Sequence, residues 1–399
     1  MSELSAPYLR HSLSERVGEF IALRREIHAH PELAFQEHRT ADLVARKLTD
    51  WGYEVATGLG GTGVVGTLRR GRGSRRLGIR ADMDALPITE ATGHAWSSQT
   101  PGVMHACGHD GHTATLLAAA RHLAEHGDFD GTLHLIFQPA EEGAAGAVRM
   151  MDDGLFERFP CDTLFALHNM PGSPTGHFTF RAGATMASSD NVTITLQGIG
   201  GHGAMPHTTA DPLVAASSIV MALQTVVSRN VDPLQTAVVT VGALQAGQAN
   251  NVIPDQATLK LSVRALDPEV RSLLKQRIHE LVTQQAASYR VRAAIDWQDG
   301  YAVLINDSAC TTLAVELATR LFGAERVTPN GAPITASEDF AFMLQRVPGC
   351  YFFVGNGATG TPGACMVHNP GYDFNDDIIA DGAAFWSALV HEVLVPANG

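Results

Sequence analysis

The sequence predicts an α/β protein with a mostly parallel sheet and flanking helices, into which a smaller ferredoxin-like α+β domain is inserted. Helical and strand-like segments alternate in the first part of the chain. The order then changes to strand, helix, strand, strand, helix, strand, and afterwards the first rhythm resumes. With 399 residues, the chain also exceeds what one hydrophobic core usually organises, which favours two domains.

The first part of the predicted catalytic domain covers residues 1–186. Apolar periodicity predicts helices at 13–29, 38–50, 110–126 and 143–153. Runs rich in β-branched and apolar residues predict strands at VVGTL, RLGIRADMD, 131–138 and 163–169. This alternation predicts parallel strands joined by helices that cover the sheet.

The inserted domain is expected at residues 187–298. Strands are predicted at 190–198, 235–245, 256–266 and 289–298, and helices at 211–229 and 267–287. From 299 to 399 the first domain is expected to resume, with a helix at 308–322, a strand at 349–355 and a last helix from about Asp381.

Charge and cysteine content narrow the class of function. A net charge of −13 argues against a nucleic-acid partner, because phosphate binding requires a basic surface, and a small-molecule substrate is expected instead. The five cysteines form no CxxC pair, which indicates reduced thiols and a cytoplasmic protein. The N-terminal twenty residues contain no continuous apolar run, so neither a signal peptide nor a membrane span is expected.

The segment MHACGHDGH is the most informative motif for chemistry. Cys107 and His109 are two residues apart in a glycine-flanked loop that leads into a predicted helix. A thiolate and an imidazole suit a borderline transition metal better than magnesium or calcium. The alternative interpretation is a tight turn with a buried cysteine before a helix.

Two adjacent carboxylates, Glu141 and Glu142, follow the predicted buried strand GTLHLIFQ. Ligands in α/β proteins bind at the ends of such strands. Because consecutive side chains diverge in an extended stretch, one carboxylate can bind a metal while the other faces the substrate. The alternative is a solvated acidic turn at a helix N-terminus.

Further candidate side chains end other predicted strands or lie in a late loop. Asp82 and Asp84 are expected to face the same strand-terminal crevice, where a carboxylate can orient a ligating histidine. His168 ends the strand TLFALHN, and His368 lies in the loop MVHNPGYDFND. Each of these taken alone could be a turn or core residue.

The combination predicts a metal centre. Cys107, His109, Glu142, His168 and His368 are too many donors for one tetrahedral ion with an open position, but they suit two ions with a shared ligand and a water. His202, within GIGGHGAMPH of the inserted domain, could reach into such a site because the glycines permit close backbone approach; the alternative is a flexible turn.

The sequence resembles the aminoacylase, hippurate hydrolase and indole-acetyl-amino-acid hydrolase family, within the dimetal aminoacylase and carboxypeptidase superfamily. The resemblance covers nearly the whole chain through these motifs: RREIHAHPELAFQE, IRADMDALPI, MHACGHDGHTA, FQPAEEGAAGA, ALHNMP, GGHGAMPH, NVIPDQATLKLSVRA, SEDFAFM, PGCYFFVGNG and VHNPGYDFND. The implied fold is that of the dimetal exopeptidases with an inserted lid domain.

The resemblance implies specific roles for residues at matching positions. It implies metal ligation by the five donors named above, with Glu141 as the general base and Asp84 as the carboxylate that keeps the ligands in register. Asp82 stands where the wider superfamily has a histidine ligand, and it is not expected to be a ligand here. His202 is implied to reach a partner subunit's active site across a homodimer formed by the lid. Asn251 and Arg264 are implied to grip the substrate carboxylate.

The predicted function is metal-dependent hydrolysis of the amide bond of N-acyl amino acids, which yields a carboxylic acid and a free amino acid. Two divalent ions are expected, either manganese or zinc, with cobalt or nickel also compatible with the donors. The closest alternative is a dimetal exopeptidase for short peptides, which shares this machinery. A thiol hydrolase with Cys107 as nucleophile and a metal-storage protein are more distant alternatives.

Overall fold

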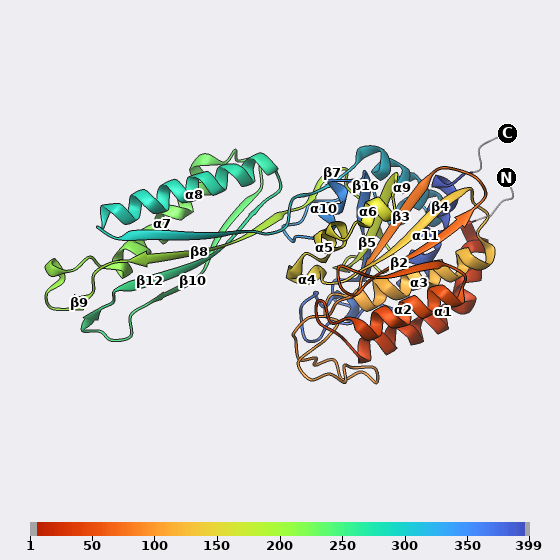
Figure 1. Cartoon of the computed structure of the whole chain (residues 1–399), viewed down its shortest axis with the longest axis horizontal. Helices are drawn as coiled ribbons and strands as arrows, with labels where there is room; N and C mark the ends of the chain where they lie inside the picture. Colours follow the sequence, from red (N-terminus) through yellow and green to blue (C-terminus); the bar gives the residue numbers. More distant parts are fainter. Residues whose placement is uncertain (1–5, 396–399) are drawn as a thin grey trace. The chain divides into compact units, whose positions relative to one another are not determined.

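The computed structural model describes residues 6–395, so the first five and last four residues of the predicted catalytic domain lie outside the described residues. The chain divides into two compact units (Figure 1). Unit 1 comprises the described parts of Met1–Gly183, Asn306–Ala332 and Phe342–Gly399. Unit 2 comprises Ala184–Ile305 and Pro333–Ala341, and the range 187–298 expected for the inserted domain lies within it.

Unit 1 is built on an eight-stranded sheet. In spatial order its strands are β1 (Glu54–Leu59), β2 (Gly63–Arg70), β4 (Gly131–Gln138), β3 (Arg76–Asp82), β5 (Thr163–Gly172), β16 (Gly349–Ala358), β6 (Phe178–Thr179) and β15 (Val327–Thr328). The four central strands β4, β3, β5 and β16 run parallel. Every residue of β4 is buried, as expected for a parallel strand covered on both faces.

Helices of unit 1 pack against this sheet and against one another. They are α1 (Ala6–Ala29), α2 (His38–Asp50), α3 (His109–His126), α4 (Glu141–Ala144), α5 (Gly146–Asp152), α6 (Leu155–Arg158), α9 (Ser308–Phe322) and α11 (Ile378–Val393). α1, α3 and α11 form one packed layer, and Leu116, Trp386 and Leu389 are among its fully buried apolar side chains. Short 3-10 turns lie at Ala324–Arg326 (η2) and Pro362–Ala364 (η3).

Unit 2 has the ferredoxin-like order of strands. β8 (Ser188–Gln197), β10 (Ala237–Ala246), β12 (Gln256–Ala265) and β13 (Arg292–Asp299) form an antiparallel sheet in the order β10-β12-β8-β13. α7 (Pro212–Asn230) and α8 (Pro268–Ser288) lie side by side over it (Figure 1). Each helix has an aspartate as its N-cap, Asp211 or Asp267, and a proline as its first residue. The aspartate carboxylate accepts hydrogen bonds from two backbone N–H groups of the first turn.

Smaller elements complete the two units. β9 (Gly201–His202) pairs with β11 (Val252–Ile253) and precedes the 3-10 turn η1 (Pro206–Thr208). β7 (Gly183–Met186) pairs with β14 (Leu304–Asn306) where the chain enters and leaves unit 2, and α10 (Phe340–Leu344) follows later.

α7 is long and apolar enough to cross a membrane by length and composition alone. However, Ala215, Ile219, Leu223 and Val226 on one side of it are buried in the core of unit 2. We therefore regard α7 as a core helix of this unit.

The observed elements follow the sequence prediction closely, with one informative error. The segment 143–153, predicted as one helix, is broken into α4 and α5. Ala145 adopts a left-handed backbone conformation with φ 55°, and Gly143 has φ 77°. Helical periodicity alone could not reveal this break, which shapes the turn that carries Glu141 and Glu142.

Candidate metal centre

Two groups of side chains with metal-binding atoms meet in unit 1. In one group, the ligand atoms of Cys107, His109 and His168 all lie within 4.8 Å of one another. In the other, those of Cys107, Glu142 and His368 meet the same limit. Because Cys107 belongs to both groups, the five donors expected from the sequence lie together around one shared thiol.

Three neighbouring parallel strands bring polar side chains of this centre to one edge of the sheet. Asp82 ends β3, Glu141 follows β4, and His168 lies in β5. Since β4, β3 and β5 are adjacent and parallel, their carboxyl ends face the same edge, where α/β proteins place ligands.

The loop that carries Cys107 and His109 requires the glycine between them. Gly108 has φ 91°. A Cβ at this position would lie 2.4 Å from both Asn169 Nδ2 and Tyr372 Oη. Only glycine allows the ligand loop to approach these side chains so closely.

His368 is held in an unusual backbone conformation beside this loop. Its φ of 66° is uncommon for a residue other than glycine, and such conformations concentrate at functional sites. The His368 N–H donates to Ala106 O at 2.7 Å. His368 Nε2 lies 3.1 Å from Glu142 Oε1. The backbone hydrogen bond to Ala106 therefore holds the His368 loop in place, with the His368 ring beside Glu142.

Asp84 fixes two of the candidate ligands. One carboxylate oxygen lies 3.2 Å from His109 Nδ1, and the other accepts the Glu142 N–H at 2.9 Å. Burial opposes protonation of His109, but the carboxylates of Asp82, Asp84 and Glu142 raise its pKa to about 10. Asp84 thus leaves His109 Nε2 free to bind an ion, as carboxylates behind metal-binding histidines usually do.

Asp82 is committed to other partners. Its two carboxylate oxygens accept from Arg80 Nη1 and His112 Nδ1, both at 2.6 Å. The pKa of Asp82 lies well below its usual value because His109, Arg80 and His112 outweigh the effect of burial. Because Asp82, His109 and His112 also have ligand atoms within 4.8 Å of one another, the expectation that Asp82 does not bind a metal stays a prediction.

His168 is oriented by its own neighbourhood. Its Nδ1 donates to Asn169 O at 2.7 Å, while its Nε2 lies 3.3 Å from Cys107 Sγ. The ring centroid of His112 is 4.6 Å away. Burial, together with His112 and His109, keeps the pKa of His168 well below its usual value. A neutral imidazole with Nε2 toward the thiol is the form that binds a metal.

The turn with Glu141 and Glu142 differs from the expected geometry. The prediction that these neighbours diverge as in a strand is wrong, because their carboxylate atoms both lie within 4.8 Å of His109 in a third group. Ala140 is left-handed at φ 54°, and Glu142 has a non-helical ψ of 79°. The strained turn directs both carboxylates to the centre.

Buried Glu37 holds the start of this turn. Its Oε1 accepts the N–H groups of Ala140 at 2.9 Å and of Phe35 at 3.0 Å, and its Oε2 accepts the Thr62 hydroxyl at 2.5 Å. Burial raises the pKa of Glu37. Glu37 and Asp84 therefore fix the backbone on both sides of Glu141.

The donors fit divalent cations. His109 Nε2 is buried without a hydrogen-bond partner among the described residues, and the nearest Asp82 oxygen is 3.8 Å away. Burial and the carboxylates of Glu142 and Glu141 raise the pKa of the Cys107 thiol well above its usual value. A cation reverses this effect, whereas a metal-free thiolate nucleophile is opposed by it.

The expected substrate-binding residues lie in unit 2 and are far less enclosed. His202 is exposed at the end of β9 and Asn251 is exposed just before β11, and the Gly203 N–H donates to Asn251 O. Arg264 is near the opposite end of β12, beside Ser189, and donates to Thr335 O. Within this unit, the structure brings the segments of His202 and Asn251 together, and places Arg264 at the other end of β12 from them.

Several residues that support the centre were not assigned roles from the sequence. They are Arg24, His28, Glu37, Asp110, His112, Asn169 and Tyr372. All of them fall within the motifs RREIHAHPELAFQE, MHACGHDGHTA, ALHNMP and VHNPGYDFND, which carried the resemblance. The available signal was their place in these motifs, beside the residues that were assigned roles.

Comparison with known proteins identifies the family. Residues 78–392 match peptidase family M20/M25/M40. A hippurate hydrolase from Campylobacter jejuni is 45% identical, with 94% of this chain and 97% of that protein covered. An N-acetyl-L-cysteine deacetylase from Bacillus subtilis is 38% identical, with coverage of 94% and 88%.

A solved structure supports the same assignment. A dinuclear metal-binding peptidase of the M20 family from Bacillus subtilis superposes with a TM-score of 0.82 at 31% identity, covering 95% of this chain and 98% of that one. The resemblance drawn from the sequence, the fold class and the prediction of a hydrolase for carbon–nitrogen bonds are confirmed. The chain belongs to peptidase family M20/M25/M40 as one of its amidohydrolases.

Proposed function

We propose that the protein hydrolyses the amide bond of N-acyl amino acids with two divalent ions per subunit. The carrying observation is that Cys107 belongs to two donor groups, with the Glu141 carboxylate beside them. By their names, the relatives from Campylobacter jejuni and Bacillus subtilis act on a benzoyl and an acetyl conjugate of an amino acid. These names support an N-acyl amino acid as the substrate class.

The proposed ligand sets follow the two groups. Cys107, His109 and His168 hold one ion, and Cys107, Glu142 and His368 hold the other. Manganese and zinc are the proposed metals, and cobalt and nickel also suit a set of thiolate, imidazole and carboxylate donors. When bound, such ions lower the pKa of a water to roughly 7 and polarise the amide carbonyl.

Glu141 is the proposed general base. Its side chain is almost fully buried at the end of β4, and its backbone is fixed between the contacts of Glu37 and Asp84. The carboxylate accepts a proton from the attacking water and then delivers it to the amine nitrogen of the leaving amino acid. The same carboxylate thus acts first as general base and then as general acid.

Unit 2 is the proposed lid and dimerisation domain. The end of β12 nearest to Asn251 is Gln256, and roughly 27 Å of extended strand separates it from Arg264. If Arg264, His202 and Asn251 all contact one small substrate, Arg264 must come from one subunit and the other two from its partner. In this proposal Arg264 binds the substrate carboxylate with Asn251, and His202 stabilises the carbonyl oxygen.

The surface of unit 2 supports self-association. Leu213, Val214 and Met221 on α7 have exposed fractions of 39%, 47% and 71%, and Leu244 on the edge strand β10 has 42%. An edge strand beside exposed apolar side chains favours pairing with a second copy. The proposed assembly is a homodimer, or a higher oligomer built from it.

A cytoplasmic location is also proposed. All five cysteines are free, including the fully buried Cys350 and the half-buried Cys161. Free thiols of this number are typical of a reducing compartment.

The test is hydrolysis by metal-stripped protein with and without added Mn²⁺ or Zn²⁺. The substrates are hippurate, N-acetyl-L-cysteine, an indole-acetyl amino acid and unblocked dipeptides. Metal-restored cleavage of the N-acyl amino acids is expected. Cleavage of dipeptides alone would replace the proposal with the exopeptidase alternative, and cleavage without metal would return Cys107 as a nucleophile.

A further inference from the structure

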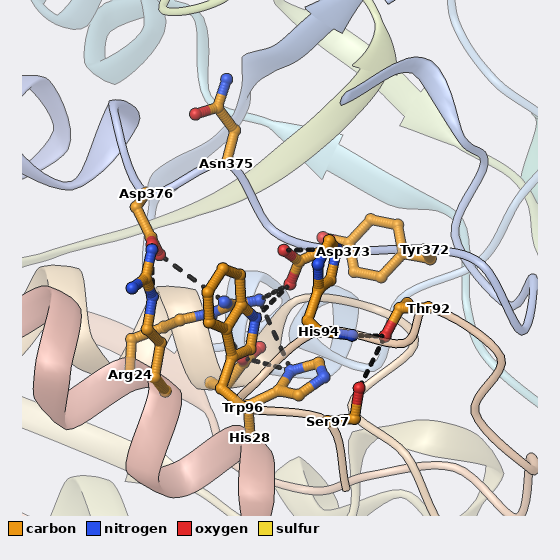
Figure 2. Close-up of polar contacts among 12 residues, drawn as sticks. Arg24, His28, Thr92, His94, Trp96, Ser97, Tyr372, Asp373, Asn375 and Asp376 are labelled. Atoms are coloured by element: carbon orange, nitrogen blue, oxygen red, sulfur yellow. Dashed lines mark hydrogen bonds and ion pairs between the residues drawn. The ribbon is translucent and has the colours of Figure 1, made fainter. Parts of the chain in front are cut away.

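A buried charged cluster lies behind the metal centre in unit 1. Arg24 of α1 is fully buried, and its Nε lies 2.8 Å from Asp110 Oδ2. The same guanidinium pairs with Asp373 and has Asp376 Oδ1 at 3.6 Å from Nη1. Figure 2 shows Arg24 with Asp373 and Asp376, which come from the opposite end of the chain.

His28, one turn later on α1, extends the cluster. Its Nδ1 lies 2.8 Å from Asp110 Oδ2, and its Nε2 lies 3.4 Å from Glu90 Oε2. Glu90 in turn accepts the Ser98 N–H at 2.6 Å. Two cations of one helix thus hold three separate segments: the start of α3, the loop around Glu90, and the loop around Asp373.

Two of these segments carry proposed metal ligands. Asp110 directly follows His109, and Asp373 is in the loop that begins at His368. Close packing joins the same segments, because a Cβ at Gly111 would lie 2.3 Å from the Phe374 ring. The spacing between the two ligand loops is therefore fixed at the backbone bond from His368 to Ala106 and again at Arg24.

The contribution of this cluster to stability does not by itself explain why it is present. Burial opposes the charge on Arg24, and the carboxylates of Asp110, Asp373 and Asp376 compensate for it and raise its pKa. Well-packed apolar residues usually stabilise a core at least as well as a buried ion cluster does. What the planar, forked guanidinium adds is a fixed geometry among several carboxylates.

We propose that Arg24 is a positioning residue which holds the His368 loop against the Cys107–His109 loop and so sets the affinity for the ion bound by Cys107, Glu142 and His368. This inference rests on the proposed two-metal centre. The ion bound by Cys107, His109 and His168 is less dependent on Arg24, because Asp84 holds His109 and the backbone of Asn169 holds His168. Loss of Arg24 should therefore affect the two ions unequally.

The experiment titrates metal-free protein with Mn²⁺ and compares Arg24→Met, Arg24→Lys and wild type by calorimetry and bound-metal analysis. Wild type is expected to bind two ions. Arg24→Met should bind one ion as wild type does and the other about 10- to 100-fold more weakly, as is typical when a residue behind a ligand is lost. Arg24→Lys should recover part of the loss, since it restores the charge but not the fork.

Arg25 offers a matched control on the same helix. It pairs with Asp376 and lies over the Trp96 ring at 3.7 Å, with a side chain that is 39% exposed. Arg25→Met removes an arginine without touching Asp110 or Asp373. It should bind both ions with wild-type affinity.

Asp373→Asn provides a second test of the proposal that does not depend on the folding of the Arg24 variants. Its side chain is 22% exposed, and the substitution keeps the shape while removing the charge that faces Arg24. Thermal unfolding of the metal-free proteins reports the structural effect separately. Unequal weakening of the two ions in a folded Asp373→Asn protein supports the proposal even if Arg24→Met does not fold.

The positioning role would be overturned if the folded variants lost affinity for both ions equally, or if their affinity for both ions were unchanged. The cluster would then have a structural role. Failure of wild type itself to bind two ions would instead reject the proposed two-metal centre. The two failures are therefore distinguishable.

Discussion

The candidate residues of the two units differ in how firmly they are held. In unit 1, Cys107 and His109 are buried, and Asp84 fixes both His109 and the backbone of Glu142. In unit 2, His202 and Asn251 are exposed, and the strands β9 and β11 at which they lie are two residues long each. The candidate metal centre is therefore enclosed and held within unit 1, whereas the residues proposed to bind the substrate are exposed in unit 2.

The largest effect is expected from Glu141. Glu141→Ala should reduce kcat by about 10²- to 10⁴-fold, the usual contribution of general acid–base catalysis. Metal content should stay at the wild-type level, because Glu142 and not Glu141 belongs to the proposed ligand sets. Steady-state kinetics and bound-metal analysis on the same preparation test both points. Glu157→Ala, on an exposed side chain, is the control, and an active Glu141→Ala protein would remove the proposed base.

The second effect tests whether unit 2 acts across a dimer. His202→Ala should reduce kcat by about 10²- to 10³-fold, as for loss of a group that stabilises an oxyanion. If His202 serves the partner's centre, His202→Ala and Glu141→Ala subunits that are mixed and reassociated should regain roughly a quarter of wild-type activity. About half of the dimers are then mixed, and each mixed dimer has one intact site of two. No recovery on mixing would mean that His202 acts within its own subunit or not at all.

His207 supplies the control for this experiment. It is an exposed histidine in the same segment, within η1. His207→Ala should leave kcat and KM unchanged, which would exclude a general effect of altering this loop.

A smaller effect is expected from Asp84, and it appears in metal binding. Asp84→Asn removes the negative charge and leaves one acceptor oxygen where His109 and the Glu142 N–H now use two, so metal affinity should fall by about 10- to 100-fold. Competition with a chelator measures this change. Asp162→Asn, which breaks an exposed pair with Arg76 before β5, should not alter it. Equal metal affinity in the two variants would contradict the proposed role of Asp84 in holding the ligands.

The smallest effect is expected from Glu37. Glu37→Ala leaves two N–H groups without their acceptor, at about 1–3 kcal/mol each in the free energy of unfolding. The freed turn should lower kcat by about tenfold with little change in KM, since small displacements of a base are costly. Glu37→Gln keeps an acceptor and should recover most of both losses. Chemical denaturation and steady-state kinetics provide the two measurements.

The sequence predicted well what depends on local pattern. Buried strands, amphipathic helices and the βαββαβ order are encoded in periodicity, so nearly all long elements were placed within a few residues. The motif around Cys107 and His109 and the polar residues after β3, β4 and β5 indicated the site for a related reason. Parallel strands deliver the residues at their carboxyl ends to one edge.

Local pattern failed where backbone strain or remote contacts decide the geometry. Ala140 precedes a stretch predicted to be extended and Ala145 lies in a segment predicted to be helical, yet both residues are left-handed. The conformation at Ala140 depends on Glu37, 103 residues earlier in the chain. No sequence window of helical or strand length contains both partners.

What the sequence determined by itself is the set of chemical groups and the order of the elements that carry them. The tertiary structure alone decided which groups stand behind the donors: Asp84 behind His109, His112 beside His168, and Arg24 against Asp373, a pair separated by 349 residues. The physical reason is that donor types and periodicities are local properties of the chain. The position of each donor is instead set by buried hydrogen bonds and ion pairs that form only when distant segments pack together.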